Sequence, residues 1–320
     1  MEPNICPLLP LRVGVTTRAM FDLTEEHATF ERDGHQAYSR LQRERERVLL
    51  KPGAAFEVTR QLLGLNNQHA HPIVEVILLS QNSPDLSLRA FNSFEYYDLP
   101  IRHGSFTSGR SVAPFVKAWD IDLFLSNNEK DVRAAVEVGT AAARLGRVPN
   151  LAHDDPLDEV RIALDCDGVV FSEESEKVYR ESGIERFLKL ERDNACVAME
   201  RGVFGSTFLP KLARLRDLCR KADGTSRVRI AIVTARNAPA HERVIQTLRE
   251  WGTPADEAHF VGEHDKGTIL KAIRAHIFFD DKEKHVTSAS GVVPTGWVPL
   301  PLTARPCSNR TLDLKVAGPP

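Results

Sequence analysis

Short apolar runs alternate along the chain with longer stretches in which apolar residues recur at helical spacing. Apolar runs that are rich in β-branched residues are typical of buried strands, and the stretches between them favour helices. Their regular alternation predicts parallel sheets and an α/β fold of the Rossmann-like type. The pattern predicts strands at residues 13–16, 75–80, 123–126, 162–165, 229–234 and 277–280, and helices at residues 35–50, 85–96, 111–118, 130–145, 207–221, 240–251 and 268–275.

The two halves of the chain share one pattern. Residues 79–130 align with residues 233–284 without a gap at an offset of 154, and residues 13–18 align with residues 162–167 at an offset of 149. We interpret this similarity as an internal repeat. The alternative is coincidence, because any two α/β segments share a similar spacing of strands and helices.

The composition of the segments between the elements predicts two domains, residues 1–152 and residues 153–320. The boundary is expected within residues 147–159, which are rich in Pro, Asp and Asn. Residues 173–227 separate two predicted strands of the second half, and we expect them to form a small helical cap. The proline-rich tail from Pro294 onward is expected to be extended on the surface or disordered.

Composition and charge narrow the class of protein. The 320 residues suffice for one large or two ordinary domains, and 42% hydrophobic with 27% charged residues is ordinary globular usage. A net charge of -2 argues against a binder of nucleic acid polymers, which needs a clear basic excess. The five cysteines show no CxxC spacing and indicate reduced thiols. Because neither a leader peptide nor a membrane span is evident, we expect a cytoplasmic protein.

The chemistry is concentrated at the ends of predicted strands. Asp165 and Asp167 end one apolar run, and Asp280 and Asp281 end another. In open α/β sheets ligands bind just beyond the carboxyl ends of the strands. Clustered carboxylates repel one another, so we expect a cation between them, and Mg²⁺ is the usual choice for an all-oxygen site. Between the two acidic pairs come Thr234, at a third strand end, and Lys266.

The order DxD, Thr, Lys, DD resembles the four motifs of the haloacid-dehalogenase-like superfamily of phosphotransferases. The resemblance implies that Asp165 is the nucleophile, forming an aspartyl-phosphate, and that Asp167 is the general acid and base. Thr234 would hold a phosphoryl oxygen and Lys266 would offset negative charge. Mg²⁺ would be bound by Asp165, Asp280 and the main-chain carbonyl of Asp167, with Asp281 as an outer ligand or holding a metal-bound water.

In the first half, Thr16 and Arg18 stand where the second half has Asp165 and Asp167. This half therefore resembles a degenerate haloacid-dehalogenase-like domain that can be neither phosphorylated nor bind Mg²⁺ in the same way. Its expected role is substrate binding, a lid or packing.

A closer resemblance rests on VGVTTRAMFDL, IALDCDGVVFSEESE, IVTARNAPAHERVIQTLREWG and AHIFFDDKEKHV, spread over roughly residues 10–290. Together these segments are similar to the cytosolic 5′-nucleotidase I family. The resemblance implies Mg²⁺-dependent removal of the 5′-phosphate from nucleoside monophosphates, often AMP, by a homo-oligomer. One departure is Gly168, where alanine is expected in the family, and we expect that difference to be conservative for the chemistry.

Candidate substrate contacts lie in the first half. The segment 106–111 combines a glycine with hydroxyls and a guanidinium, which suits a phosphate or a ribose, although it is equally consistent with a surface loop. Two alternative functions stay open: a phosphatase of another small phosphorylated metabolite, because these motifs report the chemistry and not the leaving group, and a non-catalytic nucleotide-binding regulatory protein. The candidate substrate contacts are Arg18, Asn82, Thr107, Ser108, Gly109, Arg110 and Asn127.

Overall fold

The computed structural model describes residues 10–146 and 159–301. Within these ranges ten strands form one large sheet, and the short strands β2 (Phe21–Asp22) and β3 (Lys51–Pro52) pair separately. The order across the large sheet is β10 (Glu257–Phe260), β9 (Val228–Thr234), β8 (Val160–Leu164), β11 (Ile277–Asp280), β12 (Thr295–Trp297), β7 (Ala141–Leu145), β6 (Leu123–Ser126), β1 (Leu11–Val15), β4 (Val74–Ser80) and β5 (His103–Phe106).

The large sheet consists of two parallel runs of five strands that meet at β7 and β12. All neighbouring strands are parallel except this pair, which is antiparallel, so the two runs point in opposite directions. From the outer edge inward, the orders are β5-β4-β1-β6-β7 and β10-β9-β8-β11-β12. The second run thus repeats the order of the first.

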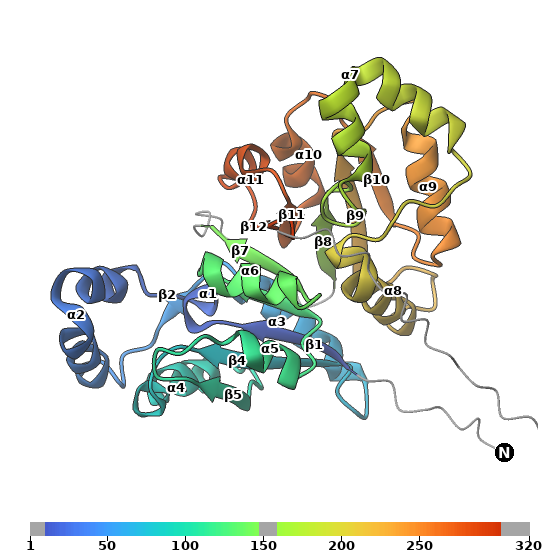
Figure 1. The fold of residues 1–320 in the computed structure, drawn as a ribbon. Coiled ribbons are helices and arrows are strands. Elements are labelled where there is room, and N and C mark those ends of the chain that lie inside the picture. Colours follow the sequence, from blue (N-terminus) through green and yellow to red (C-terminus); the bar gives the residue numbers. More distant parts are fainter. Residues whose placement is uncertain (1–9, 147–158, 302–320) are drawn as a thin grey trace, which may run out of the picture.

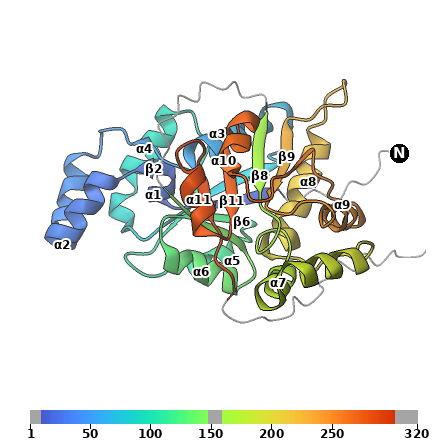
Figure 2. The same cartoon turned by 90° about the horizontal axis from the view of Figure 1, so that it is seen from above.

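Helices cover both faces of the sheet (Figures 1 and 2). The N-terminal half contains α1 (Thr17–Met20), α2 (Thr24–Glu44), α3 (Phe56–Gly64), α4 (Leu88–Tyr96), α5 (Ala113–Ala118) and α6 (Glu129–Glu137). The C-terminal half contains α7 (Glu174–Asp193), α8 (Leu209–Leu218), α9 (His241–Glu250), α10 (Lys266–Ile273) and α11 (Glu283–Ala289).

The core follows from the alternation of side chains along the strands. In β4, Leu78 belongs to one apolar cluster, whereas its neighbours Ile77 and Leu79 belong to another on the opposite face. The first cluster extends along both halves of the sheet and includes α3 and α8. Burial on both faces explains why the strands read as continuous apolar runs in the sequence.

Two helices, α2 and α7, stand away from the sheet in both views (Figures 1 and 2). Each is kinked at a glycine with a positive φ, Gly34 at 80° and Gly183 at 77°. Glycine takes this conformation without the steric cost that a side chain would add. The helix α7 lies in the segment expected to form a cap, whereas α8 packs against β9 and β1.

The sequence predicted the six strands at the centres of the two runs to within two residues at each end. The helix predicted at residues 130–145 is wrong beyond Glu137, because Gly139 turns the chain at φ 82° and the alanine-rich β7 follows. The helix predicted at residues 35–50 begins earlier, at Thr24, and ends at Glu44. Strands β5, β7, β10 and β12 were not predicted.

The tail from Pro294 differs in part from the expectation. Thr295–Trp297 form β12, and Val298 is fully buried, so this part of the tail lies in the sheet. Residues 302–320 and the domain boundary at residues 152 and 153 lie outside the described residues. Every helix within the described ranges is too short or too polar to cross a membrane.

Candidate active site

The fold brings the predicted catalytic and metal-binding residues together at the carboxyl ends of three adjacent strands. Asp165 follows β8, Thr234 ends β9 and Asp280 ends β11, and these strands are neighbours in the sheet. Lys266 begins α10, beside them. All four residues are buried, with at most 4% of any of them exposed. This is the location at which parallel α/β sheets bind their ligands.

Lys266 bridges two of the carboxylates. Its Nζ lies 3.0 Å from Asp165 Oδ1 and 2.7 Å from Asp280 Oδ2. Burial raises the pKa of Asp165 to about 6, although Lys266 opposes the shift. Buried carboxylates are stable in the ionised form only when positive charge compensates them, so Lys266 supplies part of what the site needs.

Asp281 is the carboxylate with the least compensation. Its Oδ1 is buried and has no hydrogen-bond partner among the described residues. Burial, together with Asp165 and Asp280, raises the pKa of Asp281 to about 8. The Trp297 indole donates a hydrogen bond of 2.8 Å to the main-chain carbonyl of Asp281 and so fixes the backbone at this position.

Gly168 makes room for this carboxylate. It has φ 76°, and a Cβ placed there would lie 2.7 Å from the Asp281 Cγ. Glycine is therefore required on two grounds, the backbone conformation and the close approach of a side chain. An alanine at this position would therefore be sterically strained in this chain, and the expectation that the difference is conservative for the chemistry stays a prediction.

The donor set fits a divalent cation. Ligand atoms of Asp165, Asp280 and His285 lie within 4.8 Å of one another. With Asp281 ionised, three carboxylates face the buried ammonium of Lys266, and Lys282, which also pairs with Glu176, is a second positive charge nearby. Asp281 Oδ1 still lacks a partner among the described residues. Carboxylate oxygens are the ligands that Mg²⁺ prefers. His285 contacts Asp280 Oδ2 through Nδ1 at 3.0 Å.

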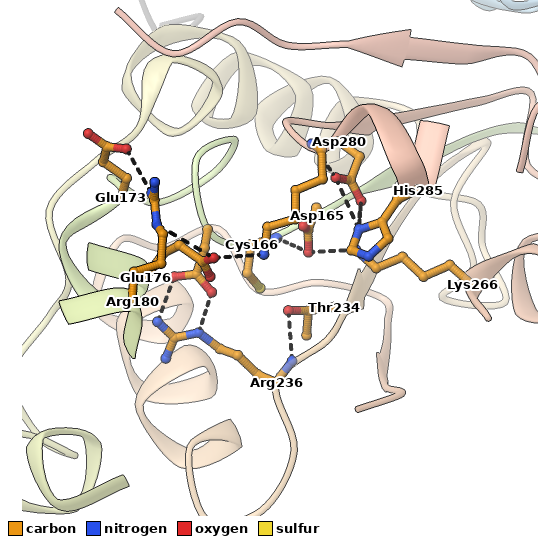
Figure 3. Close-up of polar contacts among 12 residues, drawn as sticks. Asp165, Cys166, Glu173, Glu176, Arg180, Thr234, Arg236, Lys266, Asp280 and His285 are labelled. Atoms are coloured by element: carbon orange, nitrogen blue, oxygen red, sulfur yellow. Dashed lines mark hydrogen bonds and ion pairs between the residues drawn. The ribbon is translucent and has the colours of Figure 1, made fainter. Parts of the chain in front are cut away.

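Asp167 has a partner that the sequence did not predict. Arg236 donates two hydrogen bonds to its carboxylate, from Nε to Oδ2 and from Nη2 to Oδ1, each 2.7 Å long. In Figure 3, Arg236 and Asp280 lie on opposite sides of Asp165. The signal available in the sequence was the position of Arg236 two residues beyond Thr234, at the same strand end. Glu191, which pairs with Arg236 from α7, carries no such local signal.

The predicted substrate residues gather elsewhere. Arg18 lies in α1, and Asn82 and Asn127 follow β4 and β6, at the carboxyl ends of the N-terminal strands. Because the two runs of strands point in opposite directions, these ends do not coincide with the end that carries Asp165. Among the described residues, no hydrogen bond or ion pair links Arg18, Asn82, Asn127 or residues 107–110 to the catalytic set. Their contact with substrate stays a prediction.

The segment 106–111 does not present free backbone donors to a phosphate. The N–H groups of Thr107, Ser108 and Gly109 donate to the carbonyls of residues 80, 82 and 81. These bonds tie the loop to the end of β4. The exposed side chains of Arg110 and Ser108 remain as groups in this segment that could bind an anion.

Comparison with known proteins gives two findings. Residues 8–305 match the family model described as 5′-nucleotidase. The chain is also 29% identical over 293 residues to human cytosolic 5′-nucleotidase 1B, an alignment that covers 88% of this chain and 48% of that protein. The chain thus spans about half the length of this relative.

Proposed function

The chain belongs to the 5′-nucleotidase family, and on that basis we propose that it hydrolyses nucleoside 5′-monophosphates such as AMP to nucleoside and phosphate. The observation that carries the proposal is the buried contact between Asp165 and Lys266 at the carboxyl end of β8. A nucleophilic carboxylate needs an adjacent cation when an anionic phosphate approaches it. The family match extends over the whole of this site.

The reaction proceeds in two displacements at phosphorus. A carboxylate oxygen of Asp165 bonds to the phosphorus as the bond to the 5′-oxygen breaks, and Asp167 gives its proton to that oxygen. Water then attacks the phosphorus of the aspartyl-phosphate and gives a proton to Asp167. This second step releases phosphate and restores both carboxyl groups. Thr234 holds a phosphoryl oxygen, and Lys266 offsets the negative charge of phosphate and nucleophile.

The residues that would hold Mg²⁺ are Asp165, Asp280 and the main-chain carbonyl of Asp167, with Asp281 in direct or water-mediated contact. When bound, the cation supplies positive charge that the carboxylate cluster lacks and neutralises the phosphate. The unpartnered Asp281 Oδ1 and the raised pKa of Asp281 support this assignment. Chelation should abolish phosphate release and added Mg²⁺ should restore it, whereas Ca²⁺ should support it poorly because its coordination is looser.

The N-terminal half is, in this proposal, a degenerate haloacid-dehalogenase-like domain that acts as a structural partner of the catalytic half or as a source of substrate contacts. The repeated strand order and the two kinked helices support it. The catalytic domain would contain the cap α7. We further propose that the protein is a homo-oligomer. Its proposed compartment is the cytosol, by analogy with the relative named as cytosolic.

The test is phosphate release from every common nucleoside monophosphate and from a set of sugar phosphates, with Asp165→Asn as the control. We expect nucleotides to be the better substrates. Activity confined to sugar phosphates would overturn the nucleotidase assignment but would remain consistent with phosphate ester hydrolysis through Asp165. If no ester releases phosphate in the presence of Mg²⁺, both the nucleotidase assignment and the hydrolytic mechanism are overturned, and a nucleotide-binding protein is favoured.

A further inference from the structure

A chain of buried charges connects α7 to Asp167. Arg236 is 4% exposed and holds Asp167 by two hydrogen bonds from one edge of its guanidinium. Its remaining terminal nitrogen, Nη1, pairs with Glu191 Oε2 of α7. An arginine engaged at two points by a carboxylate cannot rotate without breaking both bonds.

Glu191 is itself fixed. The Ser175 hydroxyl donates to Glu191 Oε1 at 2.8 Å, and Arg243 Nη1 lies 3.1 Å from the same oxygen. The Glu191 side chain is fully buried. Arg243 also donates from Nε to the carbonyl of Val197, just beyond α7. The two arginines therefore share Glu191, but only Arg236 contacts Asp167.

The N-terminal half retains one part of this arrangement and lacks the other. At the offsets of 149 and 154, Arg89 is equivalent to Arg243, and it donates from Nε to the carbonyl of Val48 as Arg243 does to Val197. Asn82 replaces Arg236 and Gln42 replaces Glu191. Both are bonded to the Tyr38 hydroxyl.

Arg18 replaces Asp167 in that half, and neither Asn82 nor Gln42 is hydrogen-bonded to it. The half without catalytic carboxylates thus keeps the arginine that anchors the kinked helix and has lost the arginine that holds Asp167. Arg89 anchors its kinked helix through Glu26 and Gln42 with no arginine at the position of Asn82, so anchoring by itself does not account for Arg236.

We propose that Arg236, braced by Glu191, is the positioning residue that orients Asp167 toward the leaving oxygen of the substrate. The two bonds to Arg236 occupy one side of the Asp167 carboxyl group and leave lone pairs on its other side for the proton that it transfers. Because Glu191 comes from α7, the position of this helix and the orientation of Asp167 are coupled. This inference rests on the proposed function.

The experiment compares two esters that differ in their need for an acid. AMP releases an alkoxide, which needs a proton from Asp167, whereas p-nitrophenyl phosphate releases a stable phenolate, which does not. The ratio kcat/KM reports the steps up to release of the leaving group, so it isolates the first displacement. General acid catalysis contributes about 10²–10⁴-fold, so in Arg236→Lys we expect kcat/KM to fall about 10²-fold for AMP and by less than about 3-fold for the aryl ester.

Further variants separate positioning from stability. In the double variant Arg236→Met with Glu191→Met, one positive and one negative buried charge leave together, while Arg243 and Asp167 each lose an ionic partner. The melting temperature should therefore fall, but the loss of kcat/KM should remain selective for AMP. Arg243→Lys is the matched control, because Arg243 shares Glu191 and does not touch Asp167. It should lower the melting temperature and change kcat/KM for the two esters by equal factors.

The outcomes are distinguishable. A loss in Arg236→Lys that is equal for AMP and the aryl ester overturns the positioning role, because it indicates a contact with the phosphate or general misfolding. A selective loss in Arg243→Lys as large as that in Arg236→Lys overturns it also. If the wild-type protein releases phosphate from neither ester, the proposed function fails and this inference fails with it.

Discussion

The two halves of the molecule have the same strand order but different charges at the strand ends. In the C-terminal half, Asp165, Asp280 and Lys266 form a compact ionic cluster. At the equivalent positions the N-terminal half has a threonine, a serine and a valine. The lysine and the carboxylates are absent together. The sheet therefore does not need the charges, because the N-terminal half forms the same strand order without them.

The kinked helices α2 and α7 share an aromatic contact at equivalent positions of the two halves. Phe30 packs edge-on against Tyr38 in the N-terminal half, with ring centroids 5.9 Å apart, and Tyr179 packs in the same way against Phe187, at 6.0 Å. These pairs occupy equivalent positions at the offset of 149. The aromatic contacts are therefore structural features of both helices, whereas the ionic cluster belongs to one half alone.

Asp165→Asn should have the largest effect on activity. The amide preserves the shape of the side chain and removes the attacking charge, so phosphate release should fall by at least about 10³-fold while the protein remains folded. Thr16→Ala, at the equivalent position of the N-terminal half, should leave turnover unchanged. Similar losses of activity in the two variants would show that the activity does not depend on the C-terminal strand ends alone. The measurement is steady-state phosphate release together with circular dichroism.

The stability of the metal-free protein should depend on pH through the ionic cluster. The pKa values of Asp165 and Asp281 are raised to about 6 and about 8 from an ordinary value of 3.8. Carboxyl groups with raised folded-state pKa values stabilise the protein fully below the ordinary value and lose that contribution as pH rises through about 6 and about 8. A tenfold change in an acid dissociation constant corresponds to about 1.4 kcal/mol, so the free energy of unfolding should fall by a few kcal/mol between pH 5 and pH 9.

Urea unfolding in excess chelator measures this dependence. Asp281→Asn should flatten the upper part of the curve, because the amide cannot ionise, and Mg²⁺ should raise stability more at pH 9 than at pH 5. A free energy of unfolding that rises with pH over this range would contradict the assignment of the raised pKa values.

Gly168→Ala should have an intermediate effect. The new Cβ would lie 2.7 Å from Asp281 Cγ, and φ 76° is unfavourable for alanine. We expect a loss of about 1–3 kcal/mol in the free energy of unfolding and a lower apparent affinity for Mg²⁺. Ala19 occupies the equivalent position in α1, so Ala19→Gly is the matched exchange and should not alter the dependence on Mg²⁺. Unchanged stability and Mg²⁺ dependence in Gly168→Ala would show that Asp281 moves aside freely.

Arg110→Ala should have the smallest effect. Arg110 lies in a loop that is tied to β4 in the N-terminal half, so KM for the best nucleotide should stay unchanged if this half only packs against the catalytic half. A charged hydrogen bond to substrate is worth about 1.5–3 kcal/mol, so an increase in KM of roughly tenfold or more would show that the N-terminal half reaches the substrate. Steady-state kinetics and a melting curve on this variant distinguish the two roles proposed for that half.

The sequence by itself determined the elements whose pattern is local and strong. The six central strands are continuous apolar runs because they are buried on both faces. The candidate site residues Asp165, Thr234 and Asp280 are recognisable because each stands where such a run ends. The short strands β5, β10 and β12 and the alanine-rich β7 have weak local patterns. Their pairing with neighbouring strands forms them, and this tertiary contact is not encoded in a short window.

Only the tertiary structure decided how the halves meet and which buried groups contact one another. Because β7 and β12 pair antiparallel, the carboxyl ends of the strands in the two halves lie at opposite edges of the sheet. No local sequence pattern specifies that pairing. Glu191 and Arg236 are 45 residues apart in the chain and become partners because the fold brings the end of α7 to the residues that follow β9. Local pattern reports periodicity and burial, whereas the partner of a buried charge depends on chain segments brought together by the whole fold.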